Sequence, residues 1–279
     1  MEMEVDIVVN EAAEYFYEGL RLIERIHGIK EMKEFSYDRD IVSGYMRNQE
    51  LDGRIARELE KMKQAFEEAI GLSEEALMID PQHYEALKIK GSSYFHLGEF
   101  HTAPEPLISA LKIRETRTVL WQISRSLVEQ KEYAKALEYV DRLLQRDPRY
   151  EKGLVVACEI GEITKDFQIA LEALHVLVGT HPEKSSYRNR LYRLLNWKMK
   201  PRDLIAMAFP TCKSCGKSDG WQVKGTLVQR MICNSCGTQY RVNTGRIRKE
   251  FLKIPPPPPV TETRTQRRRR KSSSPNQSK

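Results

Sequence analysis

Four of the five cysteines in this chain stand in two close pairs near its C-terminal end. Two residues separate Cys212 from Cys215 and also Cys233 from Cys236, and 17 residues lie between the pairs. This spacing lets one tight turn present two thiolates to the same cation. A glycine follows each pair, where a positive φ and a backbone N–H directed at sulfur are often needed. The sequence therefore predicts a metal centre with four sulfur ligands.

The segment around these cysteines, residues 211–253, resembles a zinc ribbon. Its β-rich stretches are expected at 221–223, 227–232 and 239–242. The resemblance implies a structural Zn²⁺ that the module needs in order to fold, with a rubredoxin-like iron centre as the less favoured alternative. Because four cysteines fill a tetrahedral site, no catalytic role is expected for the metal. Two roles stay open for Trp221 and Tyr240: the core of the module, which we favour, and stacking on bases.

Charge is distributed unevenly along the chain, whose net charge is +7. Residues 1–210 carry −6, whereas residues 211–279 carry +13. A strongly basic segment suits phosphates or an acidic protein surface. The candidates for phosphate contacts are Arg246, Arg248, Lys249, Arg267, Arg268, Arg269, Arg270 and Lys271. The arginine run is equally compatible with a nuclear import signal or a solubilising tail.

The last segment, residues 254–279, differs in composition from the rest. It begins with five consecutive prolines and ends in a stretch rich in Ser, Asn and Gln. Such a composition favours polyproline II and lacks the apolar residues of a packed core. We expect this tail to be disordered.

A repeat of roughly 34 residues runs through the middle of the chain. Small residues, aromatic residues and alanines each recur at this interval, and prolines end two of the units. The recurring sets are Gly91, Ser124 and Cys158; Phe100, Tyr133 and Phe167; Ala103, Ala136 and Ala170; and Pro148 and Pro182. This pattern indicates stacked helical hairpins, in which small residues lie where two helices cross.

The repeats resemble tetratricopeptide repeats (TPR). Their units are expected at 50–83, 84–116, 117–150 and 151–184, and Gly71 marks either the turn or a kink of the first unit. The fold class is thus mostly α: a TPR-type α-solenoid with a small β zinc ribbon and a disordered basic tail. An amphipathic helix over 5–27 belongs to an N-terminal helical cap, residues 1–49. Capping helices are expected over 185–210.

The resemblance also implies a groove lined by the first helix of each hairpin, which would bind a peptide or helix. The partner-binding candidates are Lys88, Ser92, His96, Trp121, Arg125, Glu129, Lys152 and Glu159. Trp121 is either an anchor for the partner or a packing residue. Lys88 and Lys152 match the carboxylate clamp of chaperone-binding TPRs, but Ser92, Gln122 and Val156 do not, so that role is not favoured.

Other features of the sequence bear on its class. Scattered histidines and the lack of a phosphate-binding loop or nucleophile motif argue against an enzyme. Neither a signal peptide nor a membrane span is expected, and localisation in the cytoplasm, or in the nucleus of a eukaryote, follows as an expectation. We expect a protein-binding scaffold within a larger complex. The alternative is a nucleic-acid- or ribosome-associated protein that binds phosphates through the ribbon and tail.

Overall fold

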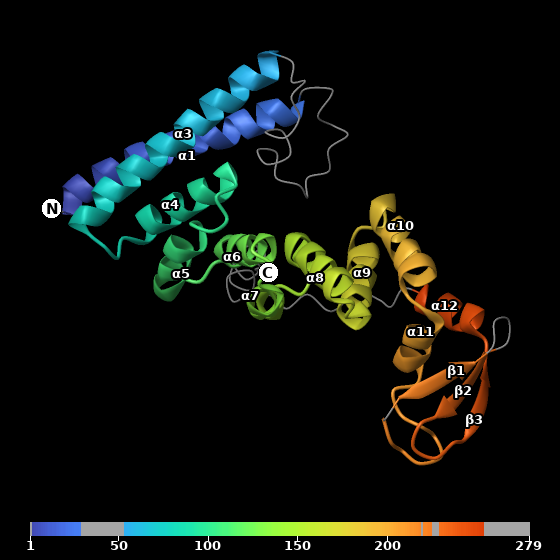
Figure 1. Cartoon of the computed structure of the whole chain (residues 1–279). Coiled ribbons are helices and arrows are strands. Elements are labelled where there is room, and N and C mark those ends of the chain that lie inside the picture. Colours follow the sequence, from blue (N-terminus) through green and yellow to red (C-terminus); the bar gives the residue numbers. More distant parts are fainter. Residues whose placement is uncertain (1, 29–52, 219, 225–228, 254–279) are drawn as a thin grey trace, which may run out of the picture. The chain divides into compact units, whose positions relative to one another are not determined.

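The computed structural model describes residues 2–28, 53–218, 220–224 and 229–253 (Figure 1). The chain divides into two compact units, Met1–Leu143 and Leu144–Lys279, which are described separately. The predicted disordered tail, with Arg267 to Lys271, lies outside the described residues.

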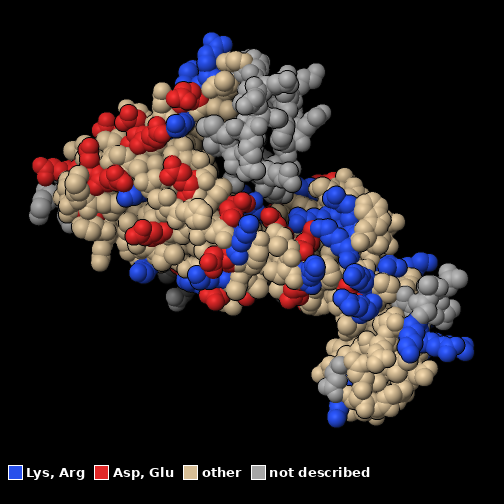
Figure 2. All heavy atoms as spheres, in the orientation of Figure 1, with Lys and Arg blue, Asp and Glu red and all other residues tan. Residues whose placement is uncertain are grey.

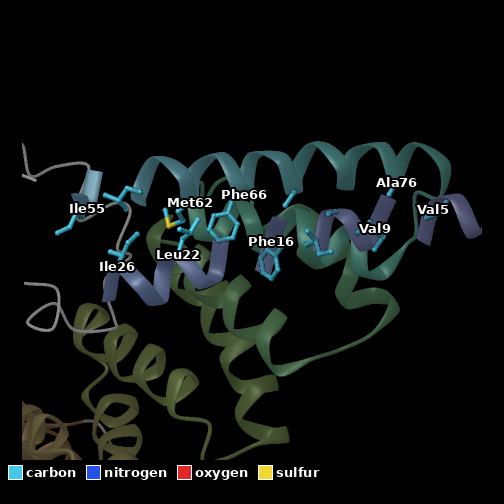
Figure 3. Packing of buried hydrophobic residues seen from close by; sticks show 14 residues of the cluster. Val5, Val9, Phe16, Leu22, Ile26, Ile55, Met62, Phe66 and Ala76 are labelled. Carbon is cyan, nitrogen blue, oxygen red and sulfur yellow. The ribbon is translucent and has the colours of Figure 1, made fainter. Parts of the chain in front are cut away.

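The first unit begins with two long helices that pack along each other, α1 (Glu2–Gly28) and α3 (Gly53–Ile79). Apolar side chains recur every three to four residues on both helices, so each has one apolar face. Figure 3 shows these faces turned toward one another, with Phe16 of α1 and Phe66 of α3 near the middle of the contact. Their ring centroids lie 5.8 Å apart. The helix predicted over 5–27 is confirmed.

The first predicted repeat differs from the expected hairpin over 50–83. Helix α3 runs without interruption through Gly71, which is exposed and has nothing near the position of a Cβ. The prediction of a hairpin turn at Gly71 was therefore wrong. The apolar face of α3 packs against α1 along its length. A break of α3 within residues 50–83 is therefore not needed to bury that face.

Two shorter hairpins follow in the first unit. The first consists of α4 (Tyr84–Leu97) and α5 (Pro104–Ile113), and the second of α6 (Arg117–Glu129) and α7 (Tyr133–Arg146). Gly98 ends α4 in the left-handed conformation, with φ 78°. At the crossing of α4 and α5, a Cβ on Gly91 would lie 2.6 Å from Leu107 Cγ, so a small residue is required there.

The second unit starts with a hairpin of α8 (Glu151–Thr164) and α9 (Phe167–Thr180). Helix α10 (Ser185–Arg193) continues directly into η2 (Leu194–Lys198), a single turn of π-helix, and α11 (Pro201–Ala208) follows. Leu191, Leu194 and Leu195 are fully buried. Helix α10 packs against α9, and the cap predicted for 185–210 stays a prediction.

A small antiparallel sheet and one helix complete the described chain. The sheet has the order β1 (Trp221–Lys224), β2 (Gln229–Cys233) and β3 (Gln239–Val242). In the register, Trp221 is opposite Cys233 and Met231 is opposite Tyr240. Helix α12 (Thr244–Phe251) packs against α11 and η2. The strands predicted from the sequence are confirmed, with β1 and β2 each one residue longer at the C-terminal end and residues 225–228 outside the description.

The predicted fold class is confirmed in that the described chain is mostly helical, with consecutive helical hairpins and a small three-stranded sheet near its C-terminal end. Within the described ranges, no helix has the length and apolar character needed to cross a membrane.

Candidate metal centre and binding surfaces

The four predicted metal ligands converge on one point of the second unit. The sulfur atoms of Cys212, Cys215, Cys233 and Cys236 all lie within 4.8 Å of one another. The Cys212–Cys236 and Cys215–Cys233 sulfur pairs are each 3.7 Å apart. A regular tetrahedron with Zn–S bonds of about 2.3 Å has sulfur–sulfur edges of about 3.8 Å. The spacing therefore fits a cation at the centre, whereas a disulfide requires sulfurs at about 2.05 Å.

Both cysteine pairs are held by the same backbone pattern. The N–H of Gly216 donates to Cys212 O at 2.8 Å, and that of Gly237 donates to Cys233 O at 2.9 Å. Each glycine has φ 72°, a conformation that other residues adopt only at a cost. The glycine that follows each cysteine pair is therefore explained by the positive φ that the turn requires at this position.

The ionisation of the thiols is strongly coupled at this distance. Burial raises the pKa of Cys212, but the hydroxyl of Tyr240 and nearby backbone N–H groups outweigh it and lower that pKa to about 6. At Cys215 a backbone N–H lowers the pKa, whereas burial and the neighbouring cysteines raise it to about 12. Full ionisation of four sulfurs this close would cause repulsion that a bound cation neutralises, so the geometry is that of a possible metal site.

Two aromatic residues support this cluster. Tyr240 Oη lies 3.6 Å from Cys212 Sγ and 2.7 Å from Ser214 Oγ, so it can donate to the thiolate while accepting from the serine. Trp221 packs edge-on against Tyr240 with ring centroids 5.8 Å apart, and its Nε1 donates to Phe209 O at 2.8 Å. Both side chains are half-buried, which favours the core role over base stacking.

Replacing Tyr240 with phenylalanine is expected to weaken metal binding by about tenfold, because supporting hydrogen bonds to ligands contribute on that scale. Tyr192→Phe, which changes an exposed tyrosine of α10, is the matched control and should leave the affinity unchanged. Competition with a chromophoric chelator measures both. Equal affinities for the two variants would show that the Tyr240 hydroxyl does not support the site.

The basic candidates near the metal centre have different surroundings. Arg246 and Lys249 are exposed on α12. Arg248 is half-buried, and its Nε donates to Leu195 O of η2 at 3.0 Å. Arg248 therefore joins α12 to the helical cap, which reduces its availability for phosphate. The remaining candidates, Arg267 to Lys271, lie outside the described residues.

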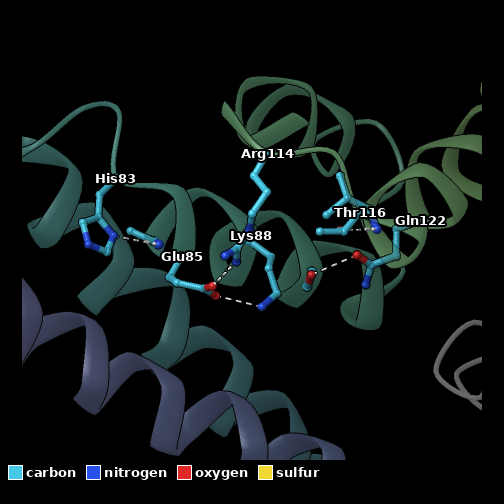
Figure 4. Close-up of polar contacts among 9 residues, drawn as sticks. His83, Glu85, Lys88, Arg114, Thr116 and Gln122 are labelled. Atoms are coloured by element: carbon cyan, nitrogen blue, oxygen red, sulfur yellow. Dashed lines mark hydrogen bonds and ion pairs between the residues drawn. The ribbon is translucent and has the colours of Figure 1, made fainter. Parts of the chain in front are cut away.

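In the first unit, the predicted groove residues of α4 are largely engaged within the protein (Figure 4). Glu85 accepts from Lys88 at 2.8 Å and from Arg114 at 2.6 Å. These contacts lower the pKa of Glu85, although burial opposes them. Ser92 is only 2% exposed and donates to Gln122 Oε1 of α6 at 3.0 Å. Ser92 therefore ties α4 to α6, and direct contact with a partner is not expected.

The larger candidates of the first unit also contact other residues of the protein. The His96 ring stacks on Phe66 with centroids 5.3 Å apart, which places it against α3. Trp121 is half-buried and packs edge-on against Phe95 at 5.2 Å. Arg125, whose side chain is 11% exposed, pairs with Glu129 at 2.5 Å. The packing interpretation of Trp121 thus gains support, and part of its ring stays accessible.

The second unit carries the two other groove candidates on α8. Lys152 is exposed and Glu159 is half-buried. The structure places them on the same helix, and they are considered apart from the candidates of the first unit.

A partly buried ionic cluster in the second unit was not predicted from the sequence. Glu162 accepts from Arg190 Nε at 2.8 Å and also pairs with Lys198, and its side chain is 11% exposed. Burial would raise the pKa of Glu162, but the two cations lower it. Cys158 Sγ lies 3.5 Å from the same carboxylate, and burial raises the pKa of this thiol to about 12. The cluster fixes α10 and η2 to α8, but its members are too far apart in sequence to form a motif.

Comparisons with known proteins leave the chain without an assigned family. No protein family matches it, and no curated protein matches it. Among solved structures it is similar to a mutant of MamA, with 14% sequence identity and a TM-score of 0.38, over 62% of this chain and 94% of that one.

Proposed function

We propose that this protein is a non-enzymatic adaptor. Its helical hairpins bind a protein partner, and its C-terminal module is a zinc ribbon with a structural role. The observation that carries the metal assignment is the convergence of four sulfurs at tetrahedral spacing. Four protein ligands complete a tetrahedral site and leave no position for a substrate, which supports structure rather than catalysis.

The surface proposed for the partner is the first-helix face of the first unit, on α4 and α6. It combines the half-buried ring of Trp121 with the charged side chains of Lys88 and Glu129. Such a surface can bind a peptide or helix in which one apolar side chain contacts the aromatic ring and neighbouring polar side chains contact the charged residues. Arg114 and Lys88 lie 3.8 and 5.9 Å from the centroid of the Tyr84 ring, which makes this end of the surface rigid and cationic.

The test is the set of proteins retained by the full chain from a lysate of its own source. Lys88→Glu reverses a charge on the proposed surface, whereas Glu138→Lys reverses one on the exposed side of α7. We expect Lys88→Glu to reduce capture of a specific partner about tenfold or more, as losses at interface centres do. Glu138→Lys should retain it. Quantitative mass spectrometry gives the comparison, and an equal effect of both variants would contradict the assignment of this surface.

A further inference from the structure

A second candidate surface lies on α10 and η2, away from the cysteines. Residues 184–202 contain seven Lys or Arg and no Asp or Glu. Figure 2 shows Lys and Arg gathered over the α8–α10 part of the second unit, and Asp and Glu over the α1–α3 part of the first. This segment therefore presents a local positive field within a region of the chain whose overall charge is negative.

Large aromatic side chains are exposed in the middle of this basic segment. Trp197 is 75% exposed and Tyr192 is 51% exposed. They border a hollow of about 500 Å³, lined by Ser186, Asn189, Tyr192, Arg193 and Trp197. No aliphatic side chain lines the hollow, so its apolar surface is aromatic. Two large aromatic side chains exposed beside the same hollow give this segment a surface on which a flat ligand can stack.

The exposed tryptophan is held by the π turn. The N–H of Met199 donates to Leu194 O at 3.0 Å, which closes this wider turn. The extra residue per turn keeps Leu194 and Leu195 buried while Trp197 points into solvent. Arg248 of α12 donates to Leu195 O within the turn. Helix α12 thus stabilises the π turn in which Trp197 is exposed.

The seven cations of this segment differ in their pairing, and Arg202 pairs with the neighbouring Asp203. Arg190 and Lys198 pair with Glu162, and Lys184 pairs with Glu151. In the described part of the chain, Arg188 and Arg193 are exposed and are paired with no carboxylate. Arg188 lies one helical turn before Tyr192 on α10, and Asn189 lies one turn before Arg193. Of these residues, Asn189, Tyr192 and Arg193 line the hollow.

We infer that this face of α10 and η2 binds single-stranded nucleic acid. Tyr192 and Trp197 stack on bases, Arg188 and Arg193 contact phosphates, and Ser186 and Asn189 supply hydrogen bonds. An acidic peptide would find the cations, but it would leave two aromatic faces without a matching partner. Unpaired bases offer both a flat π surface and a phosphate at each step. This activity is separate from the partner binding proposed for α4 and α6.

The test uses the full-length, metal-loaded protein and a fluorescently labelled 12-nucleotide single-stranded RNA of mixed sequence. Trp197→Ala should weaken binding about tenfold, because one stacked base contributes on that scale. Tyr17→Ala removes an aromatic ring that is 53% exposed on α1 and should leave binding unchanged. Arg188→Gln with Arg193→Gln should make the slope of log affinity against log salt shallower by about 1.4, from two lost phosphate contacts. Single-stranded DNA of the same sequence separates RNA from DNA as the preferred ligand.

Ultraviolet crosslinking and peptide mapping locate the contact independently of affinity. Crosslinks at Tyr192 or Trp197 support the inference. It is overturned if Trp197→Ala binds RNA as tightly as the wild type, or if crosslinks map only to the C-terminal tail. It is also overturned by a second result: a polyglutamate peptide binds the wild type more tightly than RNA does, and Trp197→Ala weakens binding of that peptide. The surface would then be a site for an acidic protein segment. Circular dichroism spectra that match the wild type confirm that each variant is folded.

Discussion

Replacing Cys233 with serine is expected to release the metal and to unfold the ribbon, residues 211–253, while the first unit keeps its structure. A structural Zn²⁺ supplies about 10–16 kcal/mol in small zinc modules, more than a three-stranded sheet of this size gains by packing. Cys233 is buried and lies at the end of β2, opposite Trp221. Its loss therefore removes a ligand and the link between the metal and the sheet.

The consequences should extend to the helical cap of the second unit. Three contacts join the ribbon and α12 to the helices: Trp221 to Phe209, Arg248 to Leu195, and the ring of His175 to Phe251 O at 2.5 Å. Without the metal, each contact loses the structure that positions one of its two partners: Trp221, Arg248 or the carbonyl of Phe251. We expect faster amide exchange in α11 and η2 of the serine variant, and unchanged exchange in α1 and α3.

Metal analysis and hydrogen exchange by mass spectrometry together measure this effect. Wild-type protein should hold one metal ion per chain, and Cys233→Ser close to none after dialysis against a chelator. Cys158→Ala is the matched control, because Cys158 is the fifth cysteine and packs in α8 beside Glu162. It should retain the full metal content. Retention of metal by Cys233→Ser would contradict the four-sulfur site.

Elements with a strong local signal were predictable from the sequence. The cysteine pairs, their glycines and the alternating residues of β1 and β3 specify the metal module through neighbours in the chain. Small residues at the repeat period also identified hairpin crossings such as Gly91. These features depend on the spacing of residue types within one repeat or one turn, which can be read directly from the sequence.

Features that depend on contacts between distant segments were not predictable. Helix α3 passes through Gly71 because α1 covers its apolar face, and a glycine in a sequence shows only the possibility of a break. Ser92 was predicted to face a partner, but its hydrogen bond to Gln122 holds it between two helices. The basic and aromatic face of α10 had a signal in the composition of residues 184–202. Its exposure, however, depends on the π turn and on Arg248.

Substituting Gly161 with alanine is expected to open the α8–α9 hairpin and to reduce the free energy of unfolding by about 3 kcal/mol, the upper end for overpacking. A Cβ at this position would lie 2.7 Å from Ala170 N and 2.7 Å from Asp166 O. Both are backbone atoms, so no side-chain rotation relieves the clash, and the two helices must separate. Ala170 and Leu174 of α9 would lose their buried positions as a result.

Gly71→Ala makes the same substitution inside a helix where nothing lies within 4 Å of the added Cβ. It should increase the free energy of unfolding by about 0.5–1 kcal/mol, because alanine favours the helix and reduces the entropy of the unfolded chain. Urea denaturation followed by circular dichroism gives both values, and hydrogen exchange assigns each change to its unit. The two variants should therefore shift stability in opposite directions. If Gly161→Ala were as stable as the wild type, α8 and α9 could not approach as closely at Gly161 as the structure shows.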